Sequence, residues 1–421
     1  MKGKRGLEGL SIVVSSLILV LSSVWPAFAE KGVTDNQILI GDMAILSGPV
    51  ASATSMDSTG LRGYWQYVNE SGGIHGRKIK VITEDTGYEI PKTITGWKKL
   101  IEQDKIFALA GIGTSTMLAL YSKVQEEKIP FFPTSQSEKF FKPPTRYIFS
   151  LMTSYEDECR VMVDYLMEDK GLKSKKDLRL GICYNEDEMG NSLLTGVQDQ
   201  LEKWGMLDKV VSKETVKRGG IDLSSQALNL KKAECNLVFG LMNSSQVGQF
   251  IRECDKLNFA PKFVTGSSGM EPFNTYRIGG KAALGLLAPS VREPWDTDAP
   301  GGVKMRALVA KIYPNLKPEQ KTIYFIYGWV KGVVMAEGLR RVGMDLTREK
   351  FVDALETLNN FVGDVGGLIG PVTYGPGRRS SGGSARVYEL VEGKENKGDY
   401  TALTGLREPK TKAQIEKVRG K

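Results

Sequence analysis

Histidine is almost absent from this sequence, and cysteine is scarce. The 421 residues include a single histidine, His75, and four cysteines, none of them in a Cys-x-x-Cys pair. This leaves no Ser-His or Cys-His pair for nucleophilic catalysis and no spacing typical of a metal site. The glycine clusters form no phosphate-binding loop in the right context. We therefore expect no enzyme, no metal site and no cofactor.

Long apolar runs are also missing after residue 29. The apolar run at residues 10–21 follows three basic residues and precedes Ala27-Phe28-Ala29, which is the order of a secretory signal peptide cleaved after Ala29. The run is too short to be a good membrane span. We predict that residues 1–29 are removed and that the mature chain is a periplasmic protein, not inserted in the membrane.

Neither sign of charge dominates. The chain carries 57 Lys and Arg against 49 Asp and Glu, a net charge of +8. Removing residues 1–29 takes away three basic residues and one acidic residue, which lowers the net charge to +6. The charges alternate along the chain without one basic stripe, so nucleic acid is not an expected partner.

Residues 106–137 contain the clearest structural pattern. An apolar run at residues 106–110 predicts a buried strand, and Met117, Leu120 and Val124 then recur at helical spacing before a second apolar run at residues 130–133. A parallel sheet with a helical crossover follows from this order. Similar units precede and follow it, so the predicted fold class is α/β.

Two polar clusters come directly after these two strands. Loops at the carboxyl ends of neighbouring parallel strands line a common crevice, and a helix that begins there favours an anion. Ordinary helix capping is the alternative for any single hydroxyl. We predict a ligand site formed by Thr114, Ser115, Thr116, Thr134, Ser135 and Gln136.

Several segments resemble the type I periplasmic binding proteins of the leucine/isoleucine/valine-binding family. The matching segments are residues 40–49, 69–79, 84–85, 103–106, 129–133, 263–269 and 370–374. The resemblance implies two Rossmann-like lobes joined by a three-segment hinge. It places residues 30–150 and 286–383 in lobe 1, residues 151–285 and 384–406 in lobe 2, and residues 407–421 in a polar tail.

The resemblance also implies roles for individual residues. Ser115 matches the family's carboxylate-binding serine, and Thr134 and Gln136 match positions that hold the ligand's amino-acid head. Asn243 and Ser267 fall where the family has a tyrosine and an acidic residue that pairs with the ligand's ammonium. Ala53 and Met189 fall where aromatic side chains pack on the ligand.

Several of these matches differ from the family pattern. Without an acid at Ser267, enclosing an ammonium group in a closed cleft costs several kcal/mol. We therefore expect a small organic acid or amide-like ligand, with a branched-chain amino acid as the alternative. A one-residue shift toward Ser268 is possible in this region, and Glu271 is the alternative source of an acid.

The resemblance implies that a monomeric chain closes on a small-molecule ligand and presents it to the permease of an ABC transporter. The alternative function is a periplasmic sensor subunit that presents the closed form to a signalling receptor. An exported chain permits disulfides. Cys235 and Cys254 are expected at the same end of a sheet, and we predict a disulfide between them, with free thiols as the alternative.

Overall fold

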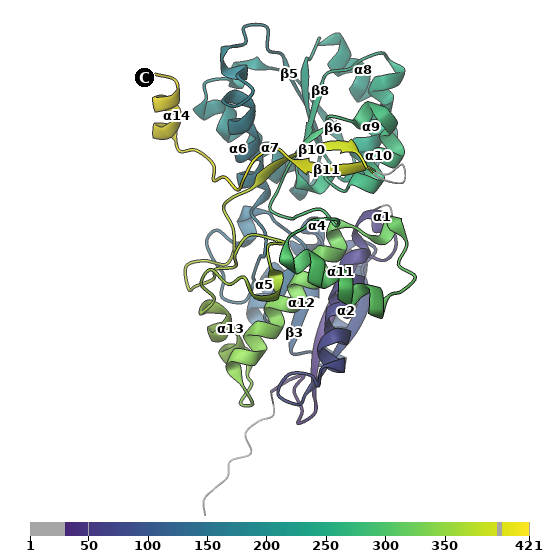
Figure 1. The fold of residues 1–421 in the computed structure, drawn as a ribbon, viewed down its shortest axis with the longest axis vertical. Helices are drawn as coiled ribbons and strands as arrows, with labels where there is room; N and C mark the ends of the chain where they lie inside the picture. The colour runs from purple at the N-terminus through teal and green to yellow at the C-terminus, as the bar shows by residue number, and fades with distance from the viewer. Residues whose placement is uncertain (1–29, 49, 394–397, 421) are drawn as a thin grey trace, which may run out of the picture.

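Two separate β-sheets organise the structure, one in each of two lobes stacked along the long axis (Figure 1). The computed structural model describes residues 30–48, 50–393 and 398–420, so the predicted signal peptide lies outside the described residues. Within the described ranges, no helix is long and apolar enough to cross a bilayer. The predicted α/β fold of two Rossmann-like lobes is confirmed.

The sheet of lobe 1 has four parallel strands in the order β2-β1-β3-β4. Every residue of β3 and β4 is buried, as expected for parallel strands covered by helices on both faces. The strands are β1 (Gln37–Ala44), β2 (Lys78–Asp85), β3 (Ala108–Gly111) and β4 (Phe131–Pro133).

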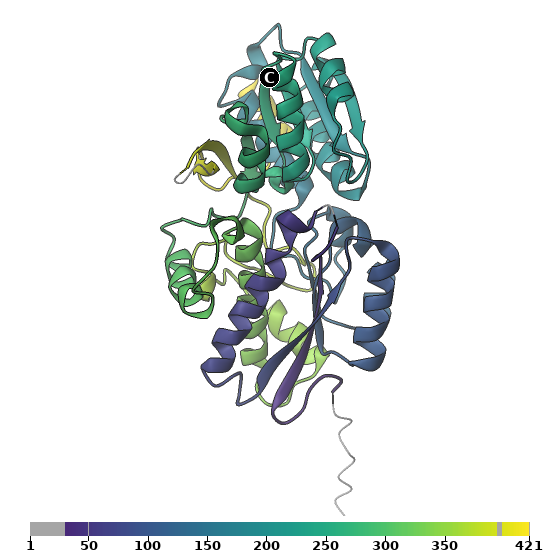
Figure 2. The same cartoon turned by 90° about the vertical axis from the view of Figure 1, so that its right-hand side faces the viewer.

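Eight helices of the described chain surround this sheet (Figure 2). The single helix expected after β3 is divided into two short helices, although Met117, Leu120 and Val124 are buried as the spacing predicts. The helices are α1 (Ala51–Thr54), α2 (Met56–Glu70), α3 (Ile90–Lys98), α4 (Thr114–Met117), α5 (Tyr121–Glu126), α11 (Pro300–Ile312), α12 (Ile323–Val342) and α13 (Arg348–Glu356).

Helices α2 and α12 pack closely because glycine lies at their contact. A Cβ atom on Gly328 would stand 1.8 Å from the carbonyl oxygen of Asp57, and one on Gly60 would stand 2.0 Å from that of Phe325. Helix α12 is apolar around most of its circumference, as a helix in the middle of a core must be. The close approach brings Asp57 of α2 beside Lys331, which lies one turn after Gly328 on α12.

The sheet of lobe 2 has seven strands in the order β11-β10-β9-β8-β7-β5-β6, and β10 is antiparallel to both of its neighbours. Its strands are β5 (Leu180–Asn185), β6 (Val210–Val216), β7 (Leu237–Leu241), β8 (Lys262–Thr265), β9 (Leu287–Ser290), β10 (Arg386–Glu392) and β11 (Gly398–Ala402). Its helices are α6 (Tyr155–Met167), α7 (Glu188–Lys203), α8 (Ser224–Lys232), α9 (Ser244–Lys256), α10 (Pro272–Gly279) and α14 (Lys412–Val418).

The second passage between the lobes comes later than predicted. The sequence interpretation returns the chain to lobe 1 at residue 286, but β9 pairs with β8 and β10 in the sheet of lobe 2. The passage therefore follows Ser290. A four-residue strand that contains Pro289 has too little periodicity to be recognised, because proline weakens a strand pattern. The first and third passages are hydrogen-bonded to each other: the Ser150 amide donates to the Arg379 carbonyl at 2.7 Å.

The predicted polar tail, residues 407–421, is folded over most of its length. It contains α14, and Ile415 of this helix is fully buried in the core of lobe 2. The amide of Lys410 also donates to the carboxylate of Asp164 at 2.7 Å. The apolar residues that anchor the helix, Ile415 and the partly buried Val418, are too weak a pattern to predict from a polar sequence.

The predicted disulfide between Cys235 and Cys254 is wrong, because all four cysteines are unpaired and buried. Cys254 interacts with the thiol of Cys183 on β5, whereas Cys235 lies against Gly181. Burial raises the pKa of Cys183 and Cys254 and raises that of Cys235 to about 11. These thiols are therefore protonated core groups.

Candidate functional site

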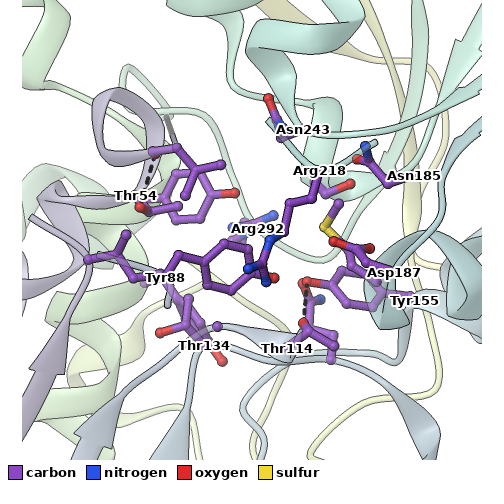
Figure 3. Close-up of a pocket in the computed structure, with 18 residues that line it drawn as sticks. Thr54, Tyr88, Thr114, Thr134, Tyr155, Asn185, Asp187, Arg218, Asn243 and Arg292 are labelled. Atoms are coloured by element: carbon purple, nitrogen blue, oxygen red, sulfur yellow. Dashed lines mark hydrogen bonds between the residues drawn. The ribbon is translucent and has the colours of Figure 1, made fainter. Parts of the chain in front are cut away.

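A cavity lies between the lobes, with a volume of about 650 Å³ that includes its opening to solvent (Figure 3). Most of its wall comes from residues that directly follow a strand, which is where open α/β sheets bind ligands. Lobe 1 contributes Ile45, Val50, Thr54, Tyr88, Gly113, Thr114, Thr134, Gln136, Tyr324 and Tyr327. Lobe 2 and its connections contribute Tyr155, Asn185, Asp187, Met189, Arg218, Asn243, Ser268 and Arg292.

The structure brings some of the predicted site residues together in this wall and leaves others behind it. The predicted residues in the wall are Thr114, Thr134, Gln136, Met189 and Asn243. Thr116 and Ser135 are buried, and the Thr116 hydroxyl donates to the Gly113 carbonyl at 3.0 Å. The side chain of Ala53 lies outside the described part of the structure, although its neighbours Val50 and Thr54 are in the wall.

Ser115 lies behind Tyr88, and the Tyr88 hydroxyl is hydrogen-bonded to both the side chain and the backbone amide of Ser115. The Tyr88 hydroxyl donates to the Ser115 Oγ at 3.2 Å and accepts from the Ser115 amide at 3.3 Å. Tyr88 holds this position with a left-handed backbone (φ 60°), which costs energy for a bulky residue. The Ser115 amide is therefore engaged within the protein, and Ser115, which the family resemblance assigns to the ligand's carboxylate, is covered by Tyr88 and is not in the cavity wall.

Arg292 provides a buried positive charge in the cavity. It follows β9 on the second passage between the lobes and is 2% exposed. One Nη donates to the Ser267 carbonyl at 3.2 Å, and the guanidinium lies 5.5 Å from the centre of the Tyr324 ring. Within the described residues, its Nε has no hydrogen-bond partner and it forms no ion pair.

The charge of Arg292 influences the carboxyl group of Glu158, and burial favours the protonated form of that group. Burial raises the pKa of Glu158 to about 8, against the opposing effects of the neighbouring Ser267 hydroxyl, the charge of Arg292 and a hydrogen bond from Gln136. The Gln136 amide donates to Glu158 Oε1 at 3.3 Å and to the Thr153 carbonyl at 2.9 Å. Burial therefore favours the neutral form of Glu158, and among the described residues no ion pair joins it to Arg292.

Thr134 is held by a buried ion pair. Lys331 Nζ lies 2.6 Å from Asp57 Oδ2 and 2.7 Å from Thr134 Oγ1, and the Thr134 hydroxyl donates to Asp57 Oδ2 at 2.5 Å. Lys331 is 1% exposed and also faces the Tyr327 ring at 4.3 Å from its centre. The hydroxyl proton of Thr134 is thus used within the protein, and one lone pair remains.

Side chains of the two lobes also meet at the edge of the cavity. Arg218 of lobe 2 lies over the ring of Tyr88 of lobe 1, 4.7 Å from its centre. Nearby, Lys139 forms an ion pair with Glu188 at 2.5 Å. In Figure 3, Arg218 extends from the upper lobe toward Tyr88, and Asp187 lies on the opposite side. Asp187 accepts from the Gly190 amide and so caps α7.

The structure places Ser267 and Ser268 differently with respect to the cavity. Ser268 lies in the cavity wall, whereas Ser267 is fully buried behind it. Glu271, the alternative source of an acid, is not among the residues lining this cavity, and its carboxylate accepts from the Asn274 amide at 2.8 Å at the start of α10. The described residues contain no group of three His, Cys, Asp or Glu side chains arranged for a metal ion.

Several wall residues were missed from the sequence, although a simple signal was available for most of them. Tyr88, Arg218 and Arg292 lie two or three residues beyond the ends of β2, β6 and β9. The rule that selected the two polar clusters also applies to these loops. Asp187, two residues beyond the end of β5, also lies in the wall. Tyr324 lies near the start of α12, far from any strand end, and has no such signal.

Two lobes with a cavity between them, lined by polar and aromatic residues from both, are the architecture of a ligand-binding protein. Comparison with known families agrees: the family model described as periplasmic binding protein matches residues 37–396. The chain therefore belongs to the periplasmic binding protein family, as a type I substrate-binding protein of the leucine/isoleucine/valine-binding kind. This is a family of ABC-transporter binding proteins and not of enzymes, and its members are exported to the periplasm.

Individual relatives are distant. A Leu/Ile/Val/Thr-binding protein of Salmonella typhimurium is 22% identical over 282 residues, which cover 67% of this chain and 73% of the relative. A leucine-, isoleucine-, valine-, threonine- and alanine-binding protein of Pseudomonas aeruginosa is 21% identical over 366 residues, which cover 87% and 92%.

Solved structures share the fold at similarly low identity. A fatty acid ABC transporter substrate-binding protein from Thermomonospora curvata has a TM-score of 0.80 at 21% identity and covers 92% of this chain and 96% of its own. A branched chain amino acid ABC transporter structure from Thermus thermophilus with bound valine has a TM-score of 0.78 at 18% identity, covering 92% and 100%. At these identities the likeness establishes the fold alone.

Proposed function

We propose that this protein captures a small organic acid between its lobes and delivers it to the permease of an ABC transporter. The observation that carries the proposal is Arg292: a buried guanidinium that faces the cavity and has no carboxylate partner in the described structure. A buried, unpaired charge is costly. A ligand carboxylate relieves this cost by forming charge-assisted hydrogen bonds with the guanidinium.

The engagement of Ser115 supports the same assignment. Because Tyr88 covers Ser115 and keeps it out of the cavity wall, we assign the recognition of a ligand carboxylate to Arg292. Arg292 lies on a passage between the lobes, so a ligand held there also contacts lobe 1 when the cleft closes. Such a ligand favours the closed form, because it makes more contacts there than in the open form.

Delivery requires export of the mature chain. We propose that the chain is cleaved after Ala29, which leaves Glu30 as the first residue in the periplasm. N-terminal sequencing of the native protein checks the position of cleavage. A native chain that keeps Met1 in the cytoplasm is incompatible with delivery to a permease.

The main test compares acids with their primary amides, which have nearly the same shape but no charge. Native mass spectrometry of the purified protein first identifies any co-purifying ligand, and calorimetric titration then measures acids and amides of the same skeleton. We expect acids to bind and amides to bind far more weakly. A hydrogen bond to a charged group is worth about 1.5–3 kcal/mol, so Arg292→Gln should weaken acid binding by about 10- to 150-fold.

Two controls make the test specific. Arg218→Gln removes the other arginine of the wall, which is exposed at the cavity edge, and should weaken acid binding much less. In cells that lack the chromosomal gene, uptake of the labelled acid should return with the wild-type chain and not with Arg292→Gln. Equal binding of acids and amides, or full affinity in Arg292→Gln, would exclude carboxylate recognition at this residue.

A further inference from the structure

The lobe 1 wall of the cavity presents hydrogen-bond acceptors whose own protons are already used. The Thr134 hydroxyl donates to Asp57, both protons of the Gln136 amide are directed to Thr153 and Glu158, and the Tyr327 hydroxyl donates to the Pro133 carbonyl at 2.9 Å. Each of these groups keeps a free acceptor lone pair. A ligand group that bonds to the side-chain oxygen of Thr134, Gln136 or Tyr327 must therefore donate.

The charge behind the wall decides which kind of donor is favoured. Asp57 lies within hydrogen-bond distance of Thr134, and by itself it would attract an ammonium group. Lys331 lies 2.6 Å from the same carboxylate oxygen, and both side chains are almost fully buried. A ligand nitrogen bonded to Thr134 Oγ1 would lie about 4.5 Å from Lys331 Nζ, since each donor sits about 2.8 Å from the shared oxygen. The attraction of Asp57 for a cation is therefore cancelled by Lys331.

We infer that Lys331 makes this wall selective for a neutral donor, so that the preferred ligand is a hydroxy-substituted carboxylic acid and not an amino acid. The inference rests on the proposed function, because Arg292 holds the carboxylate while Thr134 accepts from the hydroxyl. A hydroxyl obtains its hydrogen bond at Thr134 with a small desolvation cost. An ammonium group pays the larger cost of desolvating a charge without a net negative partner at this wall.

Matched ligand series test the preference without any mutation. The first series has the 4-methylpentanoate skeleton and consists of the 2-hydroxy acid, the 2-amino acid leucine, the 2-oxo acid and the unsubstituted acid. The second series has the 3-phenylpropanoate skeleton and the same four substituents at carbon 2. In at least one series, we expect the hydroxy acid to bind at least tenfold more tightly than each of the other three. The 2-oxo acid is the most direct comparison, because its ketone can accept but cannot donate.

Variants then assign the preference to named residues. Thr134→Val should remove the advantage of the hydroxy acid over the unsubstituted acid, and Thr134→Ser should keep it. Lys331→Met leaves the Asp57 carboxylate without its partner, so the affinity ratio of hydroxy acid to amino acid should fall at least tenfold. The double variant Asp57→Asn/Lys331→Met removes both charges and should not gain amino-acid binding.

Lys331→Met leaves the buried Asp57 carboxylate unpaired and can fail to fold. The double variant removes both charges, so it leaves no unpaired buried charge and can be measured in that case. If Lys331→Met unfolds, the ligand series and Thr134→Val still decide the question. Asp187 is the carboxylate that lies in the described cavity wall itself, so Asp187→Asn serves as the matched control. The inference would be overturned if the wild-type protein preferred the amino acid to the hydroxy acid and if Asp187→Asn lost this preference.

Other outcomes separate this inference from the proposed function. If acids bind through Arg292 but hydroxy and oxo acids bind equally, the selectivity assigned to Lys331 is wrong and the carboxylate site stands. If no acid of either series binds, and amides bind instead, both are wrong.

Discussion

Replacing Glu158 by glutamine should change the pH dependence of stability in a way that can be calculated. Glu158 lies on α6, fully buried, and it faces Arg292, Gln136 and Ser267 as well as its neighbour Asp157. Desolvation by burial raises its pKa from 4.5 to about 8. Because the native state holds this proton more tightly than the unfolded chain, native stability falls as pH rises from 4.5 to about 8 and then levels off.

The size of the effect follows from the two pKa values. Each pKa unit corresponds to about 1.36 kcal/mol, so the rise to about 8 amounts to about 5 kcal/mol at pH 8 and above. Glutamine has the shape of protonated glutamate and does not titrate. We therefore expect the free energy of unfolding of Glu158→Gln, relative to wild type, to increase by about 5 kcal/mol between pH 4.5 and pH 8.

Urea unfolding at several pH values from 4.5 to 9 measures this difference. Glu156 and Asp42 also have raised pKa values, of about 7 and about 6, but they are present in both proteins and cancel in the comparison. Glu349→Gln is the control of opposite sign. Hydrogen bonds from Tyr147 and Arg146 lower the pKa of Glu349, so its contribution to stability is present above pH 4.5 and is lost as pH falls. A difference between Glu158→Gln and wild type that stays constant with pH would refute the reasoning.

Three further predictions concern the core. Thiol titration of the denatured protein without reductant should find four thiols, and a count of two would restore the disulfide. Gly328→Ala should destabilise the protein by about 3 kcal/mol in urea unfolding, because its Cβ would overlap the Asp57 carbonyl, whereas Gly377→Ala, with nothing within 4 Å, should be nearly neutral. Ile415→Ala should lower the free energy of unfolding by about 2–5 kcal/mol in the same assay, because Ile415 is fully buried. The exposed Val303→Ala should lower it by less than about 0.5 kcal/mol. Equal effects would mean that α14 does not support lobe 2.

The elements found correctly from the sequence are those with strong local patterns. The apolar run at residues 106–110 predicts β3, and the glycines at positions 72 and 73 end α2, where both have positive φ angles. Such signals are local, because burial on both faces of a parallel strand requires an unbroken apolar run. β9 was missed because four residues with a proline carry no comparable pattern.

The ligand site was predicted in outline only. The rule that strand ends form the crevice selected Thr114, Thr134 and Gln136, and the structure places all three in the wall. Ser115 satisfied the same rule and lies behind Tyr88, because the path of the loop after β2 brings that ring onto it. No sequence pattern indicates which of two neighbouring hydroxyls another segment will cover.

The sequence by itself determined the α/β character of this protein and the family to which it belongs, since both follow from the order of apolar runs, turns and short motifs along the chain. Only the tertiary structure decided the chemistry of the cavity. Asp57 and Lys331 are 274 residues apart, and they meet because glycines let α2 and α12 approach closely. Arg292 is unpaired and Glu158 is protonated because of burial, which depends on the packing of both lobes and is not written in any local stretch of sequence.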